Sequence, residues 1–350
     1  MGMAAAELLG RARAGDGEAF RELIGPYRRE LHVHCYRMLG SFQDAEDALQ
    51  DTLLSAWQHV GAFEERASVR TWLYRIATNR CLDVLRSASR RPAVDWDVPG
   101  TELPEPSRLG EVAWLEPYPD ALLDGGLGAP PGPAVRYEQL EAISLAFVTA
   151  LQTLPPRQLA VLILRDVLGY RAKEVADLLG TTVESITSAL KRARGGLPRR
   201  PPDGGREPAP SPGSPAEQEL VAKFVRAYSS YDLQALLALL TDDVRVSMPP
   251  VPLEYHGRAA VERFYTTMLN PAWGYDFVPT RANGQPALGT YLRAPTGIRH
   301  GAGLVVLTLA GDRIRALTRF DSGVLPAFGL PRSLPAPTRE DRDQHGTHDA

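Results

Sequence analysis

Residues 174–194, EVADLLGTTVESITSALKRAR, restrict the possible fold more than any other stretch of this chain. Three apolar residues lie at helical spacing in its first half: Val175, Leu178 and Leu179. The pattern breaks at Gly180, where a turn is expected. Thr181 followed three residues later by Glu184 is typical of a capping box, which predicts that a new helix begins there. The stretch therefore predicts two short helices joined by a tight turn.

The second of these helices has two faces of different chemistry. Its inward face is expected to carry Val183, Ile186, Leu190 and Ala193, and its outer face Ser185, Ser188 and Arg192 with Lys191 alongside. Hydroxyls and cations on one exposed helix face suit entry into a DNA major groove. Five basic residues and no acidic ones lie between Ser188 and Arg200. A solvated helical hairpin in an ordinary bundle is the alternative, but the pattern favours DNA binding.

The net charge of −3 over 350 residues is unevenly distributed. Residues 93–136 carry eight acidic and two basic side chains, whereas residues 137–200 carry six acidic and nine basic ones. With 44% hydrophobic residues, the chain is long enough for two or three domains that each bury a core. We therefore expect an acidic connector before a basic module, and such a module suits a nucleic-acid partner.

Cysteine and histidine usage argues against a metal or cofactor. Cys35 and Cys81 are too far apart for a metal or redox spacing motif, which suits a reducing cytosol. His32, His34 and Cys35 suggest zinc, but no second ligand pair lies nearby, and a packed helix explains the run better. No signal peptide opens the chain, and apolar runs such as 159–164 are too short to span a membrane. We expect a cytoplasmic protein with no metal and no cofactor.

Residues 44–60 predict a strongly amphipathic helix. Its apolar positions recur every three or four residues: Ala45, Ala48, Leu49, Leu53, Ala56, Trp57 and Val60. Its polar side carries an acidic stripe around one exposed apolar residue: Asp47, Gln50, Asp51 and Leu54. Such a stripe can serve solubility alone, yet it also suits docking on a basic helical partner.

Another helix is predicted from about Val69 to Arg86. Aromatic and basic residues alternate along it: Trp72 and Tyr74 with Arg70, Arg75, Arg80 and Arg86. Together with Asn79, this combination suits contacts with phosphates and unstacked bases of single-stranded nucleic acid. For Trp72 alone, packing in the core is the favoured interpretation.

Composition divides the chain into six segments. We expect helical domains at 1–91 and 137–197, Pro- and Gly-rich linkers at 92–136 and 198–216, a third domain at 217–330 and a disordered tail at 331–350. The first linker contains a hydrophobic island, Trp114–Asp120. Burial of Trp114, Leu115 and Tyr118 against a neighbour would be favourable by roughly a few kcal/mol, so we expect this island to dock.

The third domain changes from helix to strand. The predicted elements are helices at 220–240 and 259–269 and strands at 244–248, 275–280, 287–293, 303–310 and 313–320. The last two strands flank a Gly-Asp turn that suits a hairpin. Helices followed by a meander of strands predict an α+β layer fold.

Three runs in the first 200 residues resemble those of a bacterial RNA polymerase sigma factor of the extracytoplasmic-function (ECF) group. In order along the chain they are DAEDALQDTLLSAW, RTWLYRIATNRCLDVLR and LPPRQLAVLILRDVLGYRAKEVADLLGTTVESITSALKRAR. Residues 217–330 resemble the SnoaL-like (NTF2-like) cone-shaped fold, through the runs MPP…YHGRAAV and PTRANGQPA. The resemblance implies two all-α sigma domains, the second with a helix-turn-helix, followed by an α+β SnoaL/NTF2-like domain.

The resemblance also implies roles for residues at matching positions. Asp47, Gln50, Asp51 and Leu54 match the helix that grips the clamp helices of the polymerase's largest subunit. Phe63, Trp72, Arg75 and Asn79 match the surface for the −10 promoter element, where Phe63 and Asn79 would hold a flipped base and Arg75 a phosphate. Thr182, Ser185, Ser188, Lys191 and Arg192 match the recognition helix that meets the −35 element.

We therefore expect a sigma factor that binds core RNA polymerase and promoter DNA, directs transcription initiation and performs no covalent chemistry. In this hypothesis the SnoaL-like domain regulates activity. Two alternatives use its cavity, as a SnoaL-type cyclase or isomerase or as a small-ligand sensor. Candidate acid–base residues for the enzyme have no spacing that fixes them in one pocket: Asp243, His256, Tyr265, Arg281 and Asp321.

Overall fold

The computed structural model describes residues 3–88, 103–110, 114–123, 142–197 and 207–335. These residues form two compact units, and each unit takes two separate parts of the chain. The first unit comprises residues 1–92 and 114–201, and the second comprises residues 93–113 and 202–350. The region between residues 92 and 114 therefore belongs with the C-terminal part of the sequence.

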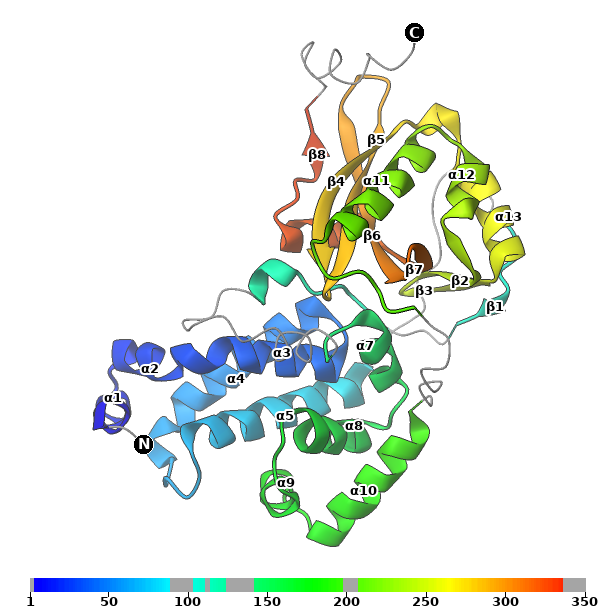
Figure 1. Ribbon diagram of the computed structural model, residues 1–350. Coiled ribbons are helices and arrows are strands. Elements are labelled where there is room, and N and C mark those ends of the chain that lie inside the picture. The colour runs from blue at the N-terminus through cyan, green and yellow to red at the C-terminus, as the bar shows by residue number, and fades with distance from the viewer. Residues whose placement is uncertain (1–2, 89–102, 111–113, 124–141, 198–206, 336–350) are drawn as a thin grey trace. The chain divides into compact units, whose positions relative to one another are not determined.

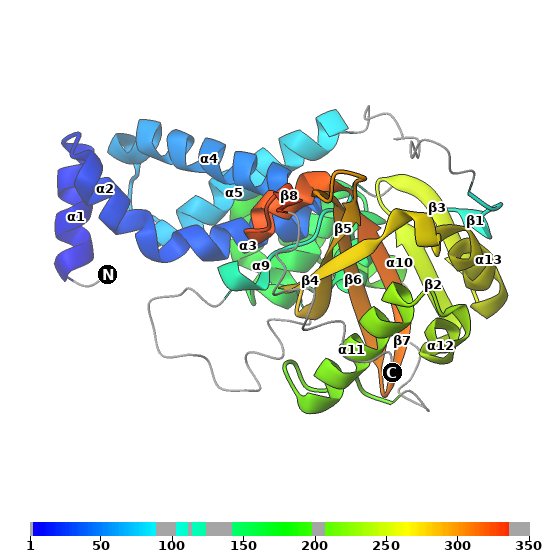
Figure 2. The same ribbon diagram turned by 90° about the horizontal axis from the view of Figure 1, so that it is seen from above.

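The N-terminal half of the first unit is helical (Figure 1). Its elements are α1 (Met3–Arg13), α2 (Gly17–Ile24), η1 (Gly25–Tyr27), α3 (Arg28–Leu39), α4 (Phe42–His59), η2 (Val60–Ala62) and α5 (Val69–Ala88). Helices α3, α4 and α5 pack side by side (Figures 1 and 2) and bury Leu31, Tyr36 and Leu73 between them. The chain can turn sharply between α3 and α4 because Gly40 takes a left-handed conformation, with φ of 71°, and Ser41 caps α4.

The second half of this unit ends in a helix-turn-helix. Its elements are η3 (Asp120–Leu122), α7 (Leu145–Gln152), α8 (Pro156–Leu162), a π turn η4 (Ile163–Val167), α9 (Ala172–Leu179) and α10 (Val183–Gly196). Gly180 ends α9 with a positive φ of 61°, as the sequence predicts. The cap of α10 is Thr182, whose side chain accepts from the Ser185 amide, so the predicted start at Thr181 is wrong by one residue. Val183 is then the first residue of the helix and is 40% exposed instead of facing inward.

The second unit is a curved sheet covered by helices. Its main elements are α11 (Pro215–Ser229), α12 (Leu233–Ala238), β2 (Leu240–Met248), β3 (Val251–His256), α13 (Arg258–Met268), η5 (Pro271–Trp273), β4 (Tyr275–Ala282), β5 (Gln285–Arg293), β6 (Arg299–Ala310), β7 (Arg313–Phe320) and η6 (Ser322–Phe328). The short strands β1 (Arg108–Leu109) and β8 (Ser333–Leu334) complete it. The sheet order is β1-β3-β2-β7-β6-β5-β4, with β8 on β6. Neighbouring strands are antiparallel except β2 and β7.

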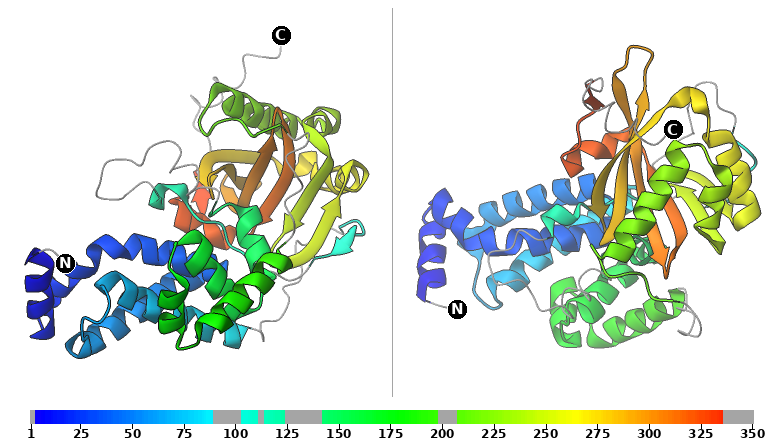
Figure 3. Two further views of the ribbon diagram at one scale, coloured as in Figure 1. Left: turned by 60° about the horizontal axis from the view of Figure 1, so that its bottom comes forward. Right: turned by 45° about the horizontal axis from the view of Figure 1, so that its top comes forward.

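The core of this unit lies between the sheet and its helices. Helices α11, α12 and α13 cover one face of the sheet (Figure 3), and the residues between them form one cluster with the strands. Aromatic rings fill much of this cluster, since the Tyr228 ring meets those of Tyr265, Tyr275 and Phe277 edge to face, with centroids 5.0–5.9 Å apart. The arrangement is the α+β cone that the sequence predicts.

Three features of this unit differ from the sequence-based expectation. The helix predicted over 220–240 is two helices, because Tyr231 takes a positive φ of 57° and Asp232 caps α12. Strands β1 and β3 were not predicted, because both are interrupted or flanked by proline, which hides a strand pattern. Strand β8 pairs with β6 inside the segment expected to be a disordered tail, and residues 336–350 of that segment lie outside the described residues.

Candidate nucleic-acid interface

The acidic stripe of α4 is exposed. Asp47, Gln50 and Asp51 face solvent, and Leu54 is 56% exposed beside them. The opposite side of the helix is buried in the three-helix layer through Ala45, Ala48, Leu49, Thr52 and Ala56. Leu54 is therefore a large apolar side chain left uncovered within an acidic surface, which suits a protein partner.

Phe63 and Trp72 form one aromatic pair. Phe63 follows η2, is only 7% exposed, and lies with its ring centroid 4.8 Å from that of Trp72. Arg13 donates to the Phe63 carbonyl and holds the turn in place. Arg75 and Asn79 follow Trp72 along α5 at helical spacing and are both exposed. Arg75 and Asn79 are thus accessible, whereas Phe63 is buried beside Trp72 and could reach a base only if this pair moved.

The outer face of α10 carries the residues predicted to read DNA. Ser185, Ser188, Lys191 and Arg192 are exposed, whereas Ile186, Ala189, Leu190 and Ala193 are buried. Thr182 is exposed as well, and its hydroxyl is occupied in capping the helix. Arg194, farther along α10, donates two hydrogen bonds of 2.8 and 2.9 Å to the Asp166 carboxylate and is therefore occupied within the protein.

Residues of α5 and α10 meet at a common cleft. A hollow of about 250 Å³ is lined by Asn79 and Arg86 from α5 and by Ser185 and Arg192 from α10. Helix α8 adds Arg157 and Gln158, which the sequence reasoning did not single out. The sequence pointed to these two residues only weakly, through a cation and an amide that directly follow Pro155-Pro156 at the start of a helix. The cleft brings together predicted residues from the −10 and −35 sets, but not those of α4.

Contacts around Arg70 and Arg37 hold the two halves of this unit together. The Arg70 guanidinium lies 2.8 Å from the Glu30 carboxylate, stacks 4.8 Å above the Tyr74 ring, and reaches the Tyr170 hydroxyl at 3.5 Å. Tyr170, on the loop after η4, is buried, and burial raises its pKa. On the other side of α3, Arg37 donates to the Ala142 carbonyl at 2.9 Å.

The histidine and cysteine cluster of α3 serves packing. His32 shares a 2.9 Å hydrogen bond with the Tyr118 hydroxyl, and His34 shares one of 2.9 Å with the Thr78 hydroxyl. Burial lowers the pKa of His32 to about 4 and that of His34 to about 3, so both rings are neutral at neutral pH. Cys35 and Cys81 are free and buried. Across the described ranges, no three side chains of metal-ligand type gather in one place.

The hydrophobic island of the first linker is docked, as the sequence predicts. Leu115 and Tyr118 are buried in the first unit, and Trp114 is partly covered. Between them, the Glu116 carboxylate accepts from the Ser41 hydroxyl at 3.0 Å and from the Gln43 amide at 2.9 Å. The Glu116 amide donates to the Gly40 carbonyl, and the Tyr36 hydroxyl donates to the Glu116 carbonyl. The island therefore caps the N-terminus of α4, a favourable place for a carboxylate.

The five candidate acid–base residues of the second unit are dispersed. Tyr265 is packed in the core, Asp321 caps η6, and His256 lies 2.7 Å from the Glu254 carboxylate. Arg281 pairs with buried Glu217 at 2.5 Å, and Asp243 lies 3.4 Å from Arg315. Of the five, Asp243 alone lines the described surface hollow of about 350 Å³. This dispersal removes the basis for a shared acid–base site.

Both units contain residues that match known protein families. Residues 23–91 match Sigma-70 region 2, residues 144–195 match Sigma-70 region 4, and residues 221–317 match the SnoaL-like domain. The ECF RNA polymerase sigma factor SigG of Mycobacterium tuberculosis is 42% identical over 336 residues, covering 92% of this chain and 86% of the relative. SigM of the same species is 34% identical over 194 residues, covering 55% and 83% of the two chains.

A solved structure shows the same arrangement of domains along the chain. The crystal structure of the M. tuberculosis extracytoplasmic-function sigma factor SigJ matches with a TM-score of 0.54 and 25% identity, covering 84% of this chain and 93% of that one.

The chain belongs to the extracytoplasmic-function RNA polymerase sigma factors and carries a C-terminal SnoaL-like domain. It is a transcription initiation factor and not an enzyme, and its partners are core RNA polymerase and promoter DNA. None of the helices in the described part of the chain has the length and apolar character needed to cross a membrane.

Proposed function

We propose that α4 is the polymerase-binding element of this sigma factor and contacts the clamp helices of the largest subunit through Asp47, Gln50, Asp51 and Leu54. Its exposed acidic stripe with an uncovered leucine supports this assignment. Opposite charges steer such an encounter, and the apolar side chain adds contact area at its centre.

We further propose that α5 and α10 read the promoter. The surface of Phe63, Trp72, Arg75 and Asn79 holds the −10 element, and Thr182, Ser185, Ser188, Lys191 and Arg192 meet the −35 element. The observation that carries this proposal is the outer face of α10, where hydroxyls and two cations are exposed over a fully buried apolar face. Small hydroxyls can approach base edges, and the cations can bind phosphates or guanine.

Promoter reading requires α5 and α10 to separate. The two elements are separate stretches of the duplex, and DNA rises about 3.4 Å per base pair, so each helix would bind at a different place along the promoter. In the structure Asn79 and Arg192 line the same cleft. We infer that the described arrangement is a closed form, and that opening would break the contacts of Arg70 with Tyr170 and of Arg37 with Ala142.

The proposed contact of Asn79 with the −10 element predicts that an Asn79 variant opens promoter DNA poorly. We expect Asn79→Ala to reduce open complexes at least about tenfold, because the amide is proposed to hold an extruded base, whose specific contacts are worth about 1–3 kcal/mol. Permanganate footprinting of the melted region measures this. Gln58→Ala removes an exposed amide from α4 and serves as the matched control. Melting of the Asn79 variant at the wild-type level would remove Asn79 from the site.

We propose that the SnoaL-like domain regulates the sigma domains through protein contacts. Support comes from the dispersed acid–base candidates and from the aromatic rings that fill its core. A small-molecule ligand is the second candidate, because three tyrosines, Tyr228, Tyr265 and Tyr275, lie together inside the cone. Burial raises the pKa of each, so their hydroxyls stay protonated and can donate hydrogen bonds.

Removal of this domain tests the regulatory proposal. The two units have separate cores, so a chain ending at Pro201 retains the first unit. We expect this truncation to bind core polymerase and to transcribe from the cognate promoter at a level different from the full chain, by about threefold or more. Run-off transcription with core enzyme measures it. Identical transcription by both proteins would overturn the regulatory proposal.

A further inference from the structure

The cleft between α5, α8 and α10 combines a buried apolar lining with a basic one. Each of the three helices contributes one cation to it, and among the described residues no acidic side chain lines it. The three cations are Arg86, Arg157 and Arg192, and all are exposed. The apolar lining residues that are no more than 8% exposed are Leu82, Val161, Ile186 and Ala189.

Two of the three cations have no carboxylate to neutralise them. Arg86 lies 2.8 Å from the Asp83 carboxylate. Arg157 and Arg192, by contrast, have neither a hydrogen bond nor an ion pair within the part of the chain that the structure describes. A guanidinium group presents paired N–H donors that match the oxygens of a phosphate. The charge of the cleft therefore favours a phosphorylated ligand.

The uncharged polar lining suits a planar base. Asn79 of α5 and Gln158 of α8 carry amides that donate and accept at once, which is the pattern that the N6 and N7 edge of adenine requires. Small-molecule sites commonly place a few polar groups around an apolar surface. The buried apolar residues can cover the face of a ring, while the amides meet its edge and the arginines its phosphates.

We propose that this cleft binds an adenine nucleotide, with the base on the apolar lining and the phosphates at Arg157 and Arg192. Such a ligand contacts α5, α8 and α10 at the same time and so stabilises the closed form. A ligand that binds one conformation shifts the population toward it. Because the effect on DNA rests on the proposed −10 and −35 roles of α5 and α10, the nucleotide is expected to compete with promoter DNA.

Isothermal titration calorimetry of the full chain with ADP, adenosine and pyrophosphate tests the site. We expect ADP to bind at least about tenfold more tightly than either of the others, because it alone uses both the amides and the arginines. Gln158→Ala keeps the charge of the cleft, so it should weaken ADP and leave pyrophosphate unchanged. Tighter binding of a single-stranded oligodeoxyadenylate than of ADP would assign the cleft to the DNA-binding surface and overturn the nucleotide site.

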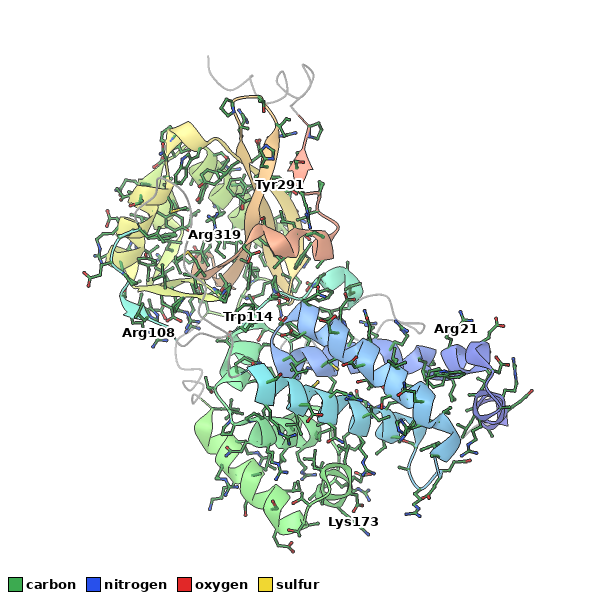
Figure 4. The ribbon with its side chains drawn as sticks, turned by 180° about the vertical axis from the view of Figure 1, so that it is seen from behind. Arg21, Arg108, Trp114, Lys173, Tyr291 and Arg319 are labelled. Carbon is green, nitrogen blue, oxygen red and sulfur yellow. The ribbon has the colours of Figure 1, made fainter. Side chains whose placement is uncertain are left out.

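Arg157→Glu reverses the charge of an exposed residue that lies outside the proposed promoter contacts. We expect it to weaken ADP at least about tenfold, since it removes a charge-assisted contact and adds a repulsion. Lys173→Glu is the matched control, because Lys173 is exposed on α9 (Figure 4), does not line the cleft and gives the same change of net charge. Thermal unfolding without nucleotide checks the fold of both variants. Equal ADP affinities for the two variants would reject the site.

The competition is measured on a labelled −35 duplex. ADP at ten times its Kd should raise the Kd of the wild-type chain for this DNA by about tenfold, and should have little effect on Arg157→Glu. ADP that binds without changing the DNA affinity would overturn the competition. The Asn79 variant tests promoter opening without any nucleotide, so failure of the nucleotide site and failure of the proposed promoter contacts give different results.

Discussion

Asp47→Lys/Asp51→Lys is expected to lose association with core RNA polymerase, with affinity falling at least about a hundredfold, because like charges placed against each other in an interface cost several kcal/mol. Both carboxylates project from the exposed side of α4, while the helix is held through its opposite face. The change should therefore leave helical content and thermal unfolding close to those of the wild type. Co-purification with core enzyme and anisotropy titration measure the loss.

The matched control for this variant is Glu18→Lys/Glu22→Lys. Both residues are exposed on α2, so the control changes the net charge by the same amount in the same unit. We expect it to bind core polymerase with nearly wild-type affinity. Equal losses for the two variants would assign the effect to net charge, and normal binding by the α4 variant would remove α4 from the interface.

The second large effect is expected at the recognition helix. Lys191→Ala/Arg192→Ala should weaken binding to −35 promoter DNA by about ten- to a hundredfold, since a broken bidentate base contact costs roughly 1–3 kcal/mol. Each lost phosphate contact should also lower the salt dependence of binding by about one unit of slope. Titration of a labelled −35 duplex at several salt concentrations separates the two contributions.

Arg194→Ala provides the control on the same helix. Its guanidinium is held by Asp166 in two bonds, so its removal breaks an internal pair and not a proposed DNA contact. The pair is largely exposed, and we expect a change in stability of no more than about 1 kcal/mol. If Arg194→Ala weakened DNA binding as much as the Lys191/Arg192 variant, the proposal that the face of α10 with Lys191 and Arg192 contacts the −35 element would be wrong.

Local periodicity was sufficient to predict the helices that carry the candidate site residues, α4, α5 and α10, and most of their faces. The stripe of α4 and the outer face of α10 are exposed where the 3.6-residue repeat places them. The error at the start of α10 came from two adjacent threonines, Thr181 and Thr182, either of which can cap a helix. Choosing the wrong one moved Val183 from the first exposed turn to the predicted core.

Features set by distant residues could not be predicted in this way. Strand β1 exists because Ser107 and Gly110 meet a partner almost 150 residues away, and two residues carry no periodicity of their own. The cleft between Asn79 and Arg192 likewise depends on how α8 and α9 pack on α5. Burial of Phe63 against Trp72 depends on the turn at η2, which the sequence shows only as a loop.

The strand donated by the linker makes the SnoaL-like domain discontinuous in sequence. A chimera that exchanges residues 202–350 between relatives would pair a new β3 with the old residues 103–110, including Arg108 opposite whatever replaces Glu254. The two segments are therefore expected to change together during evolution, as two surfaces of one interface do. The natural unit of exchange in this chain is the C-terminal part with its linker strand.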